Sequence, residues 1–435
     1  MKILHTSDWH LGHTIYDYDR SEEQKKMLDQ IADIVKEEQP DIFILAGDVY
    51  DNSQPSASVQ KMFADGLSAI HNANPMMHII VTAGNHDSGA KHEVYRTPWN
   101  ALNVTMIGLL DKNNIDSHII ELPGKAYIAA IPYAYERSIP DGFFQSVLDR
   151  IEMRNSANLP VVMTAHLTVS GCDFAGHDNA SDKIVGGISS YGVKEFGDKY
   201  DYLALGHIHK PQFIHSGKHN IRYSGSPLAV SFDENYTHPH SISIIELEKH
   251  GDKPEVRTRD IHNSKPLVTL PAKGYKDEGY NDEGHKDEGH TAKGYKTDEG
   301  YKDEGHTAKG YTAKGYTDEG YTDFDSAKEL LRKFPDNIEA YIRLNVLIDK
   351  PLPPDAKSEA VKIAEGKKCR FCCINAKWEK TGQVEPHTLT VQEFKQEDPI
   401  DIARRYIESK SITFSSEMEE MFRFAAERVK EDEDK

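Results

Sequence analysis

The 435-residue chain carries 71 Asp and Glu against 52 Lys and Arg, a formal net charge of −19, and its length allows two or three domains with a sizeable core. It has no apolar run of the roughly 18 residues that a membrane span needs, and its first residues already have the pattern of a strand, so we expect neither a membrane helix nor a signal peptide. Its 4 cysteines argue against a disulfide scaffold and favour the reducing cytoplasm, while the acidic balance lacks the basic signature typical of a DNA-binding domain.

Five short apolar runs in the first half of the chain have the composition of buried strands. They are Lys2–Thr6, Ile42–Ala46, His78–Thr82, Val161–Thr164 and Tyr202–Leu205. Each is followed at once by residues that can bind a metal: Asp8 and His10 in SDWH, Asp48 in GDVYD, Asn85 in GNHD, His166 in TAHL, and His207 and His209 in GHIH. Because ligands of layered α/β folds gather at the carboxyl ends of strands, these residues predict a metal site, and one that holds two metals.

The spacing of these residues supports shared ligation. Side chains two apart in a strand point to the same face, so we expect Asp8 and His10 to hold one ion together, and His207 and His209 repeat this spacing. A carboxylate such as Asp48 can bridge two cations about 3.5–4 Å apart, the separation that clamps both oxygens of an in-line displacement. Oxygen and imidazole ligands without thiolate suit Mn²⁺, Fe or Zn²⁺ better than Ca²⁺. Any one of these motifs could instead be loop residues that cap helices or satisfy backbone groups, but all five in order favour the metal site.

The order DxH, GDxxD, GNHD, AHL and GHxH resembles that of the calcineurin-like metallophosphoesterases. Within that superfamily, the segments ILHTSDWHLGH, ILAGDVYD, TAGNHDS, YLALGHIHKPQ and RYSGSPLAVSFDE resemble the SbcD-type nuclease subunits, because general phosphatases seldom have SGSPxxxSFDE behind GHxH. The similarity extends over roughly residues 1–270. It implies a four-layer α/β/β/α sandwich at 1–262, a small α+β capping domain at 263–395 and a C-terminal helical segment at 396–435.

The resemblance also implies a role for each residue of the site. Asp8, His10, Asp48 and His209 would hold one metal, and Asp48, Asn85, His166 and His207 would hold the other. His86 would face the scissile phosphate without binding metal and would protonate the leaving oxygen, which suits a side chain that titrates near neutrality. Asp87 either orients His86 or caps the helix expected near Ser88. Relatives outside bacteria can have a His three residues after the bridging Asp, where this chain has Asp51, which puts an assisting role there in doubt.

Such a site implies hydrolysis of a phosphodiester. Two metals polarise the phosphoryl oxygens and lower the pKa of a water, so that hydroxide attacks in line without a covalent enzyme intermediate. The sequence has no Ser or Cys in a nucleophile motif and no GxxxxGK[ST] of an ATPase. The alternatives left open are a phosphatase or small cyclic-nucleotide phosphodiesterase, and a non-catalytic scaffold, against which the complete ligand set argues.

Further implications concern substrate and partner. The resemblance implies a Mn²⁺-dependent double-strand exonuclease and single-strand or hairpin endonuclease, which processes DNA ends and recombination intermediates in repair, recombination and replication. It would act with an SbcC-type ATPase, as a homodimer of this chain within a heterotetramer. Because the net charge is −19, we expect DNA affinity to depend on that partner or on local basic patches.

A low-complexity repeat occupies residues 272–322. Glycine recurs there at every fifth position with a single slip, and Tyr or His follows each glycine. This glycine period disfavours helix and strand, and almost no aliphatic side chain is present to form a core, so we expect a disordered surface loop inserted in the capping domain. The alternatives are a tyrosine-rich tether that stacks on nucleic acid and metal capture by His285, His290 and His306.

The segments beside the repeat predict a domain of order β-α-β-α-β. Its elements are expected at Lys265–Leu270, Asp325–Phe334, Glu339–Leu347, Ser358–Ala364 and Cys369–Ala376, with an Asp or Ser at the N-cap of the first helix. In the resembling family a capping domain of this kind helps to hold DNA over the site. The cluster of Cys369, Cys372 and Cys373 lacks a second CxxC pair, so the evidence for a metal or redox role is weak.

The C-terminal segment has the pattern of two helices, Ile400–Ser409 and Ser415–Lys430. In the second helix Met418, Met421, Phe422 and Ala425 form an apolar stripe. Such a stripe packs more often on its own domain, but the resemblance implies that this segment grips the coiled-coil base of the ATPase. The amphipathic stretch Ser56–Ile70 fits either core packing or a dimer interface.

Overall fold

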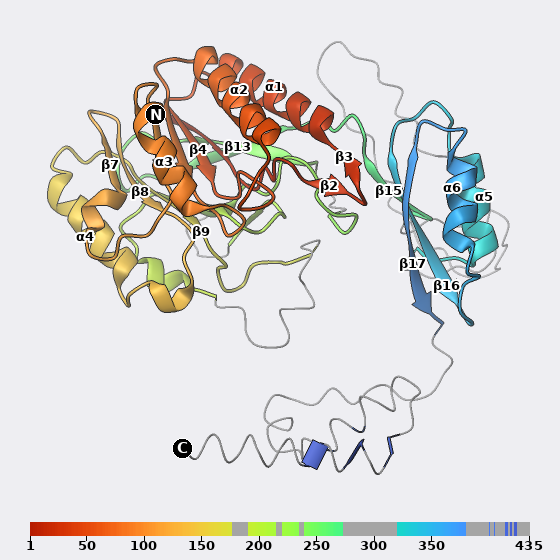
Figure 1. Cartoon of the computed structure of the whole chain (residues 1–435). Coiled ribbons are helices and arrows are strands. Elements are labelled where there is room, and N and C mark those ends of the chain that lie inside the picture. Colours follow the sequence, from red (N-terminus) through yellow and green to blue (C-terminus); the bar gives the residue numbers. More distant parts are fainter. Residues whose placement is uncertain are drawn as a thin grey trace, which may run out of the picture. The chain divides into compact units, whose positions relative to one another are not determined.

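The computed structural model describes residues 1–175, 190–214, 220–234, 239–272 and 320–379, together with residues 400, 404, 414–415, 418–419 and 422–423. The chain forms two compact units, Met1–Trp378 and Glu379–Lys435, and every helix and strand named below belongs to the first (Figure 1). Nearly all of the repeat and most of both predicted C-terminal helices lie outside the described residues. The expected domain boundaries, and the roles given to these two segments, therefore stay predictions.

Two six-stranded sheets form the centre of the first unit. The first sheet has the order β14 (Glu255–Asp260), β13 (Ser241–Glu246), β1 (Lys2–Thr6), β4 (Ile42–Ala46), β5 (His78–Thr82) and β6 (Val104–Ile107). The second has the order β11 (Gln212–Phe213), β12 (Ile221–Tyr223), β10 (Tyr202–Gly206), β9 (Val161–His166), β8 (Ala126–Ile131) and β7 (Ile119–Leu122). The four strands from β1 to β6 run parallel, as do the four from β12 to β8. Each sheet therefore brings the carboxyl ends of its central strands to one edge.

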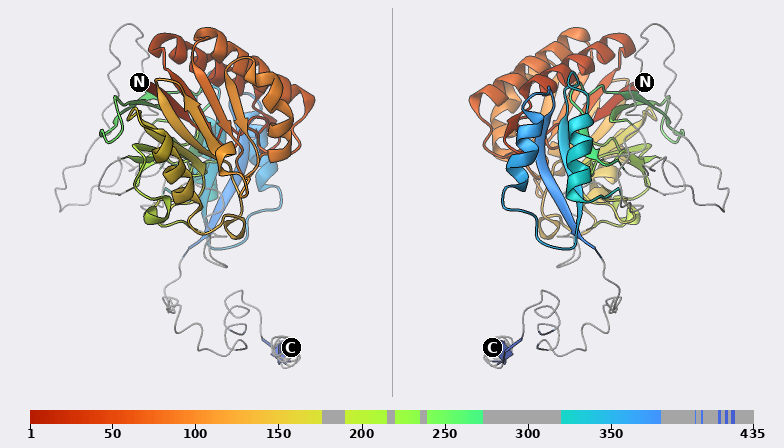
Figure 2. Two further views of the ribbon diagram at one scale, coloured as in Figure 1. Left: turned by 90° about the vertical axis from the view of Figure 1, so that its left-hand side faces the viewer. Right: turned by 90° about the vertical axis from the view of Figure 1, so that its right-hand side faces the viewer.

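Helices cover the two outer faces of this pair of sheets (Figure 2). The helices are α1 (Ser21–Glu38), α2 (Ala57–Ala73), α3 (Gly89–Asn100) and α4 (Phe143–Arg154), with 3-10 turns η1 (Ile115–His118), η2 (Glu136–Ser138) and η3 (Val193–Phe196). Side chains of α1 and α2 share one apolar cluster with the first sheet, and those of α4 and η3 share another with the second. The four-layer α/β/β/α arrangement is confirmed.

The layer between the sheets explains why these strands are apolar on both faces. Residues of the two sheets meet there in a cluster of fully buried side chains that includes Ile44, Ala46, Ile128, Val162 and Ala204. Burial of each branched aliphatic side chain contributes about 1.5–3 kcal/mol. All five predicted strands are present, and β9 and β10 extend to His166 and Gly206, beyond their expected ends.

Helix α2 contains the amphipathic stretch expected at Ser56–Ile70. The Ser56 hydroxyl accepts a hydrogen bond from the Val59 N–H, and the helix buries Met62, Phe63 and Leu67 in the core that it shares with α1. The apolar face of the stretch is therefore used for core packing, and a dimer interface on it stays a prediction.

The capping segment follows the predicted order of strands and helices. It consists of β15 (Leu267–Leu270), α5 (Phe324–Lys333), β16 (Tyr341–Ile348), α6 (Ala356–Ala364) and β17 (Arg370–Trp378). The Asp323 carboxylate caps α5 by accepting from the Ser326 N–H. All three strands are parallel, and both helices lie on one side of them (Figure 1). Parallel strands joined by helices make the segment an α/β unit, whereas an α+β domain was expected. Cys369 and Cys372 are buried here without a disulfide, and burial raises the pKa of Cys372 to about 12, which disfavours a reactive thiolate.

A short hairpin of β2 (Thr14–Ile15) and β3 (Tyr18–Asp19) meets this capping segment. The Tyr18 hydroxyl donates to the Phe371 carbonyl over 3.1 Å, and the Tyr341 hydroxyl donates to Glu23 of α1 over 2.8 Å.

The described helices include none that is both long and apolar enough to cross a membrane.

Candidate metal centre

All of the predicted ligands except His166 lie in loops that begin where the central strands end, and His166 is the last residue of β9. Asp8, His10, Asp48 and His207 all have left-handed backbone conformations, with φ of 53°, 44°, 50° and 92°. Non-glycine residues seldom adopt this conformation, and such strain is concentrated at functional sites. Asp8 and His10 lie beyond the end of β1, so the strand alternation expected to orient them does not apply. The turn itself, rather than the pleat of a strand, brings their side chains to one place.

Backbone hydrogen bonds hold the loops after β1 and β4 against each other. The Asp8 N–H donates to the Gly47 carbonyl over 3.0 Å, and the His10 N–H donates to the Asp48 carbonyl over 3.1 Å. The Asp8 carboxylate in turn accepts from the His207 N–H, which follows β10 in the other sheet, over 3.0 Å. Two main-chain hydrogen bonds and the Asp8 carboxylate therefore hold the three loops together without an ion.

Two glycines are needed because the loops approach so closely. A Cβ atom on Gly47, which has φ of 86°, would lie 2.1 Å from Nδ1 of His166. A Cβ atom on Gly84 would lie 2.1 Å from Oδ1 of Asp48 and 2.3 Å from its backbone nitrogen. The glycines of the GD and GN motifs thus leave room for the ligands, a role that the sequence analysis did not assign.

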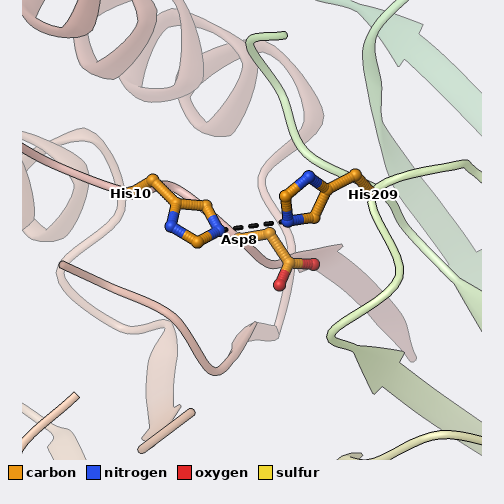
Figure 3. Close-up of side chains that lie close together, drawn as sticks. All are labelled: Asp8, His10 and His209. Carbon is orange, nitrogen blue, oxygen red and sulfur yellow. Dashed lines mark hydrogen bonds between the residues drawn. The ribbon is translucent and has the colours of Figure 1, made fainter. Parts of the chain in front are cut away.

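One half of the centre consists of Asp8, His10 and His209, all buried (Figure 3). Their ligand atoms lie within 4.8 Å of one another, and Nε2 of His10 lies 3.1 Å from Nε2 of His209. These are the residues expected at the first metal. Asp48, expected to bridge, lies beside them with Oδ2 at 3.7 Å from Nε2 of His10.

A buried carboxylate that the sequence analysis missed orients His209. Oε1 of Glu234 lies 2.8 Å from Nδ1 of His209, and its Oε2 accepts from the Ser226 hydroxyl over 2.9 Å. Because a carboxylate accepts, Nδ1 of His209 donates and Nε2 keeps its lone pair for an ion. Burial raises the pKa of Glu234 to about 7. Glu234 and Ser226 belong to SGSPLAVSFDE, so the segment that distinguishes the resembling family contributes directly to this centre.

The other half consists of Asp48, Asn85, His166 and His207. Nε2 of His166 lies 3.2 Å from Oδ2 of Asp48 and 3.0 Å from Oδ1 of Asn85, and Nδ1 of His207 lies 3.0 Å from the same Asn85 oxygen. The Ala46 carbonyl, 2.8 Å from Nδ1 of His166, fixes Nδ1 as the donor and leaves Nε2 as the atom that faces these oxygens. The structure therefore brings all seven predicted ligands together.

The donor set fits cations. Because Nδ1 of His166 donates to the Ala46 carbonyl, a neutral His166 would turn the lone pair of its Nε2 toward the oxygens of Asp48 and Asn85, and such contacts are favourable only with positive charge between them. Burial alone would lower the pKa of His166, but the Asp48 carboxylate raises it to about 9. Burial would also lower the pKa of His10, but the carboxylates of Asp51, Asp48 and Asp8 together raise it to about 9. Burial of the Asp48 carboxylate would raise its pKa, but the neighbouring His166 lowers it. Divalent ions would supply this charge in place of protons.

His86 lies at the open side of the centre. Its side chain is exposed, and its ligand atoms lie close enough to those of His10 and Asp48 to form a third possible metal group. Nδ1 of His86 lies 2.7 Å from the Asp51 carbonyl oxygen, so Nδ1 donates and Nε2 is left for substrate or ion. Asp51, whose role was in doubt, therefore contributes its carbonyl, and its carboxylate lies 3.6 Å from Nδ1 of His10.

Asp87 binds backbone rather than either group expected. Its buried carboxylate accepts from the N–H groups of Val49, Tyr50 and Gly84, over 3.1, 3.0 and 2.8 Å. Helix α3 begins with Ser88 as its N-cap residue, so Asp87 lies outside the cap position. Asp87 thus ties the loop that carries Asp48 to the loop that carries Asn85 and His86, and any effect on His86 passes through the backbone.

Comparisons with known proteins agree with this geometry. The family model of calcineurin-like phosphoesterases matches residues 1–211. The SbcD component of the nuclease SbcCD from Bacillus subtilis (strain 168) is 30% identical over 286 residues, which cover 62% of this chain and 71% of that protein. The chain belongs to the SbcD family of calcineurin-like phosphoesterases.

Two further SbcD proteins have a similar degree of identity. The Rhodobacter capsulatus protein is 29% identical over 301 residues, covering 63% of this chain and 72% of its own length. The Escherichia coli (strain K12) protein is 32% identical over 273 residues, covering 57% and 66%. Membership of the SbcD family makes the chain a phosphodiester hydrolase that uses divalent metal ions, and the donor set described above fits such ions.

Proposed function

We propose that this chain is the nuclease subunit that cleaves DNA ends, single strands and hairpins together with an SbcC-type ATPase in the cytoplasm. The observation that supports this most is the hydrogen bond between Glu234 and His209. It links the SGSPLAVSFDE segment, which general phosphatases seldom have, to a metal ligand. The names of the relatives, each a component of the nuclease SbcCD, support the same conclusion.

Divalent cations in this centre would polarise the phosphoryl oxygens and activate water for in-line attack. The remaining work belongs to the chain's own residues. Asp48, the ligand expected at both sites, would fix their spacing, and the carbonyl of Asp51 would hold the His86 ring so that its Nε2 faces the leaving oxygen. A protonated His86 could then donate to that oxygen, a step worth typically about 10²–10⁴-fold in rate. Mn²⁺ is the metal that the family resemblance implies, and carboxylate, amide and imidazole donors without thiolate are compatible with it, as they are with Fe and Zn²⁺.

The test is cleavage of DNA by the purified chain. End-labelled duplex, single-stranded and hairpin DNA would be incubated with Mn²⁺, with and without an SbcC-type partner, for the wild type and His86→Ala. We expect cleavage by the wild type and a loss of about 10²–10⁴-fold in kcat for His86→Ala, with unchanged Mn²⁺ affinity. His262→Ala is the matched control, because His262 is also exposed and its hydrogen bonds with Gln30 use only the backbone atoms of His262.

Three outcomes would contradict the proposal in different ways. Undiminished cleavage by His86→Ala would remove the role of that residue. A large loss of Mn²⁺ affinity in the same variant would make His86 a ligand. Rapid hydrolysis of small phosphate esters without cleavage of any DNA would favour the phosphatase alternative. The proposed homodimer within a heterotetramer is tested separately, by light scattering of the chain with and without its partner.

A further inference from the structure

A sixth strand end brings two tyrosines to the edge that carries the metal centre. Strand β8 ends at Ile131, and Tyr133 and Tyr135 follow it. The Tyr133 N–H donates to the Ala83 carbonyl over 2.8 Å, which ties this loop to the end of β5, two residues before Asn85. The position of Tyr133 is therefore fixed by the same strand that positions the centre.

The aromatic rings form a continuous series that begins at a metal ligand. The ring centroids of His166 and Tyr133 are 6.3 Å apart, and those of Tyr133 and Tyr135 are 5.7 Å apart, both with edge-to-face geometry. Tyr135 at the outer end is 64% exposed. The two tyrosine rings therefore extend from a metal ligand to the solvent-exposed part of this loop.

A groove beside these rings has room for a nucleotide. Its volume is about 630 Å³, within the range of about 300–1,000 Å³ typical of ligand sites, and Tyr133, Tyr135 and Leu109 line it. Leu109 is 56% exposed, so the groove presents apolar surface to solvent.

Positive charge is available at the same groove, although the chain as a whole is acidic. Lys112 lines the groove, and the guanidinium of Arg137 lies 5.6 Å from the Tyr135 ring centroid. Within the part of the chain that the structure describes, neither cation forms an ion pair. The two acids that line the groove are already engaged: Glu93 accepts from the Gly108 N–H and lies near Arg96, and Asp111 accepts from the N–H groups of its own turn.

We propose that Tyr133 and Tyr135 form a stacking platform for an unpaired nucleobase next to the scissile phosphate, with Lys112 and Arg137 bound to the adjoining phosphates. This rests on the proposed function and adds a preference to it. Stacking on aromatic rings is tolerant of base identity, but it requires a base that has left the duplex. The platform therefore favours single strands, hairpin loops and frayed ends over intact duplex.

The test separates the contribution of the bases to binding from that of the sugar-phosphate backbone. Binding of a short oligothymidylate and of an abasic backbone of the same length would be measured by fluorescence anisotropy in EDTA, and their cleavage with Mn²⁺. We expect the wild type to bind oligothymidylate about 5- to 100-fold more tightly than the abasic strand, with the difference appearing in KM rather than kcat. Tyr135→Ala should lose most of this preference and Tyr135→Phe should keep it, because the ring and not the hydroxyl stacks.

Two further variants complete the design. Tyr95→Ala is the matched control: Tyr95 is a partly exposed tyrosine of α3 whose hydroxyl donates to Gln60, and it should keep the preference. Lys112→Ala with Arg137→Ala should weaken binding of both strands about equally and reduce the salt dependence by about 1 unit of slope for each charge. Equal binding of both strands by the wild type, or an unchanged preference in Tyr135→Ala, would overturn the platform. Because binding is measured without metal, either result is independent of whether the chain cleaves DNA.

Discussion

Nδ1 of His209 lies 2.8 Å from Oε1 of Glu234, and both side chains are buried beside the metal centre. A carboxylate in this position fixes the orientation and the tautomer of the imidazole and strengthens its lone pair. This contact is the direct link between the SFDE sequence and the ligand set.

Replacement of that carboxylate should weaken metal binding. We expect Glu234→Gln to lower Mn²⁺ affinity by about 10- to 100-fold, because an amide of the same shape orients His209 less well and removes a buried negative charge. Isothermal titration of Mn²⁺ into metal-free protein measures this, with the exposed Glu248→Gln as control. Equal affinities for the wild type and Glu234→Gln would show that the contact contributes nothing to the centre.

Gly84→Ala should damage the site through sterics alone. The added methyl group would lie 2.1 Å from Oδ1 of Asp48, so either the carboxylate or the loop must move. Overpacking of this kind costs about 1–3 kcal/mol of unfolding free energy, and we expect Mn²⁺ binding to be lost with it. Gly366→Ala is the control, since a methyl group there meets nothing within 4 Å. Denaturant unfolding and titration with Mn²⁺ would check both, and full Mn²⁺ affinity in Gly84→Ala is the result that the close contact forbids.

We expect Asp87 to contribute to the stability of the fold, and not only to catalysis. Asp87→Ala removes the acceptor of three backbone amides, and we expect the unfolding free energy of the metal-free protein to fall by about 2–4 kcal/mol. Asp87→Asn keeps one acceptor oxygen and should lose less. If Asp87 acted only as the orienting partner of His86, Asp87→Ala would lose activity at unchanged stability, as measured by urea unfolding in EDTA.

Glu38 gives the fold a pH dependence that is separate from the metal centre. The pKa of Glu38 is about 2, below its ordinary value of 4.5. A hydrogen bond from Arg257 lowers it most, and hydrogen bonds from Arg259 and Lys2 lower it further, whereas partial burial would raise it. The ionised pairs therefore stabilise the fold above about pH 4.5, and this contribution is lost as the pH falls towards 2.

Glu38→Gln should accordingly lower the unfolding free energy at pH 7 by about 1–2 kcal/mol, a value reduced for solvent screening. Its difference from the wild type should shrink below pH 4.5 and vanish near pH 2. Urea unfolding in EDTA across this range measures the difference, and Glu248→Gln, at an exposed side chain outside these ion pairs, is the control. A difference that stays constant from pH 7 to pH 2 would contradict the assigned pairs.

The sequence was sufficient for the strands that carry the site and for the set of side chains that meet at their ends. Each strand that carries the site is an apolar run bounded by polar or glycine residues, and each ligand follows one directly, so a local pattern determines both. The reason given for the pairing of Asp8 with His10 was wrong, because a left-handed turn rather than a strand orients them. The same residues meet for a different physical cause.

What the sequence could not supply are contacts that depend on the meeting of distant loops. Glu234 follows His209 by 25 residues, and nothing local distinguishes it from the neighbouring Asp233, which pairs with Arg343 of the capping segment instead. The contribution of Asp51 is a backbone carbonyl, which any residue type provides. The partners of Asp87 are backbone amides, so the side-chain types of the partner residues do not reveal these contacts either.

The central claim, two cations held at the carboxyl ends of five strands, is tested most directly by anomalous diffraction from crystals soaked with Mn²⁺. The account predicts two peaks about 3.5–4 Å apart. One should lie among Asp8, His10, Asp48 and His209, and the other among Asp48, Asn85, His166 and His207, with Nε2 of His86 outside coordination distance of both. A single peak, or a peak coordinated by His86, would contradict it.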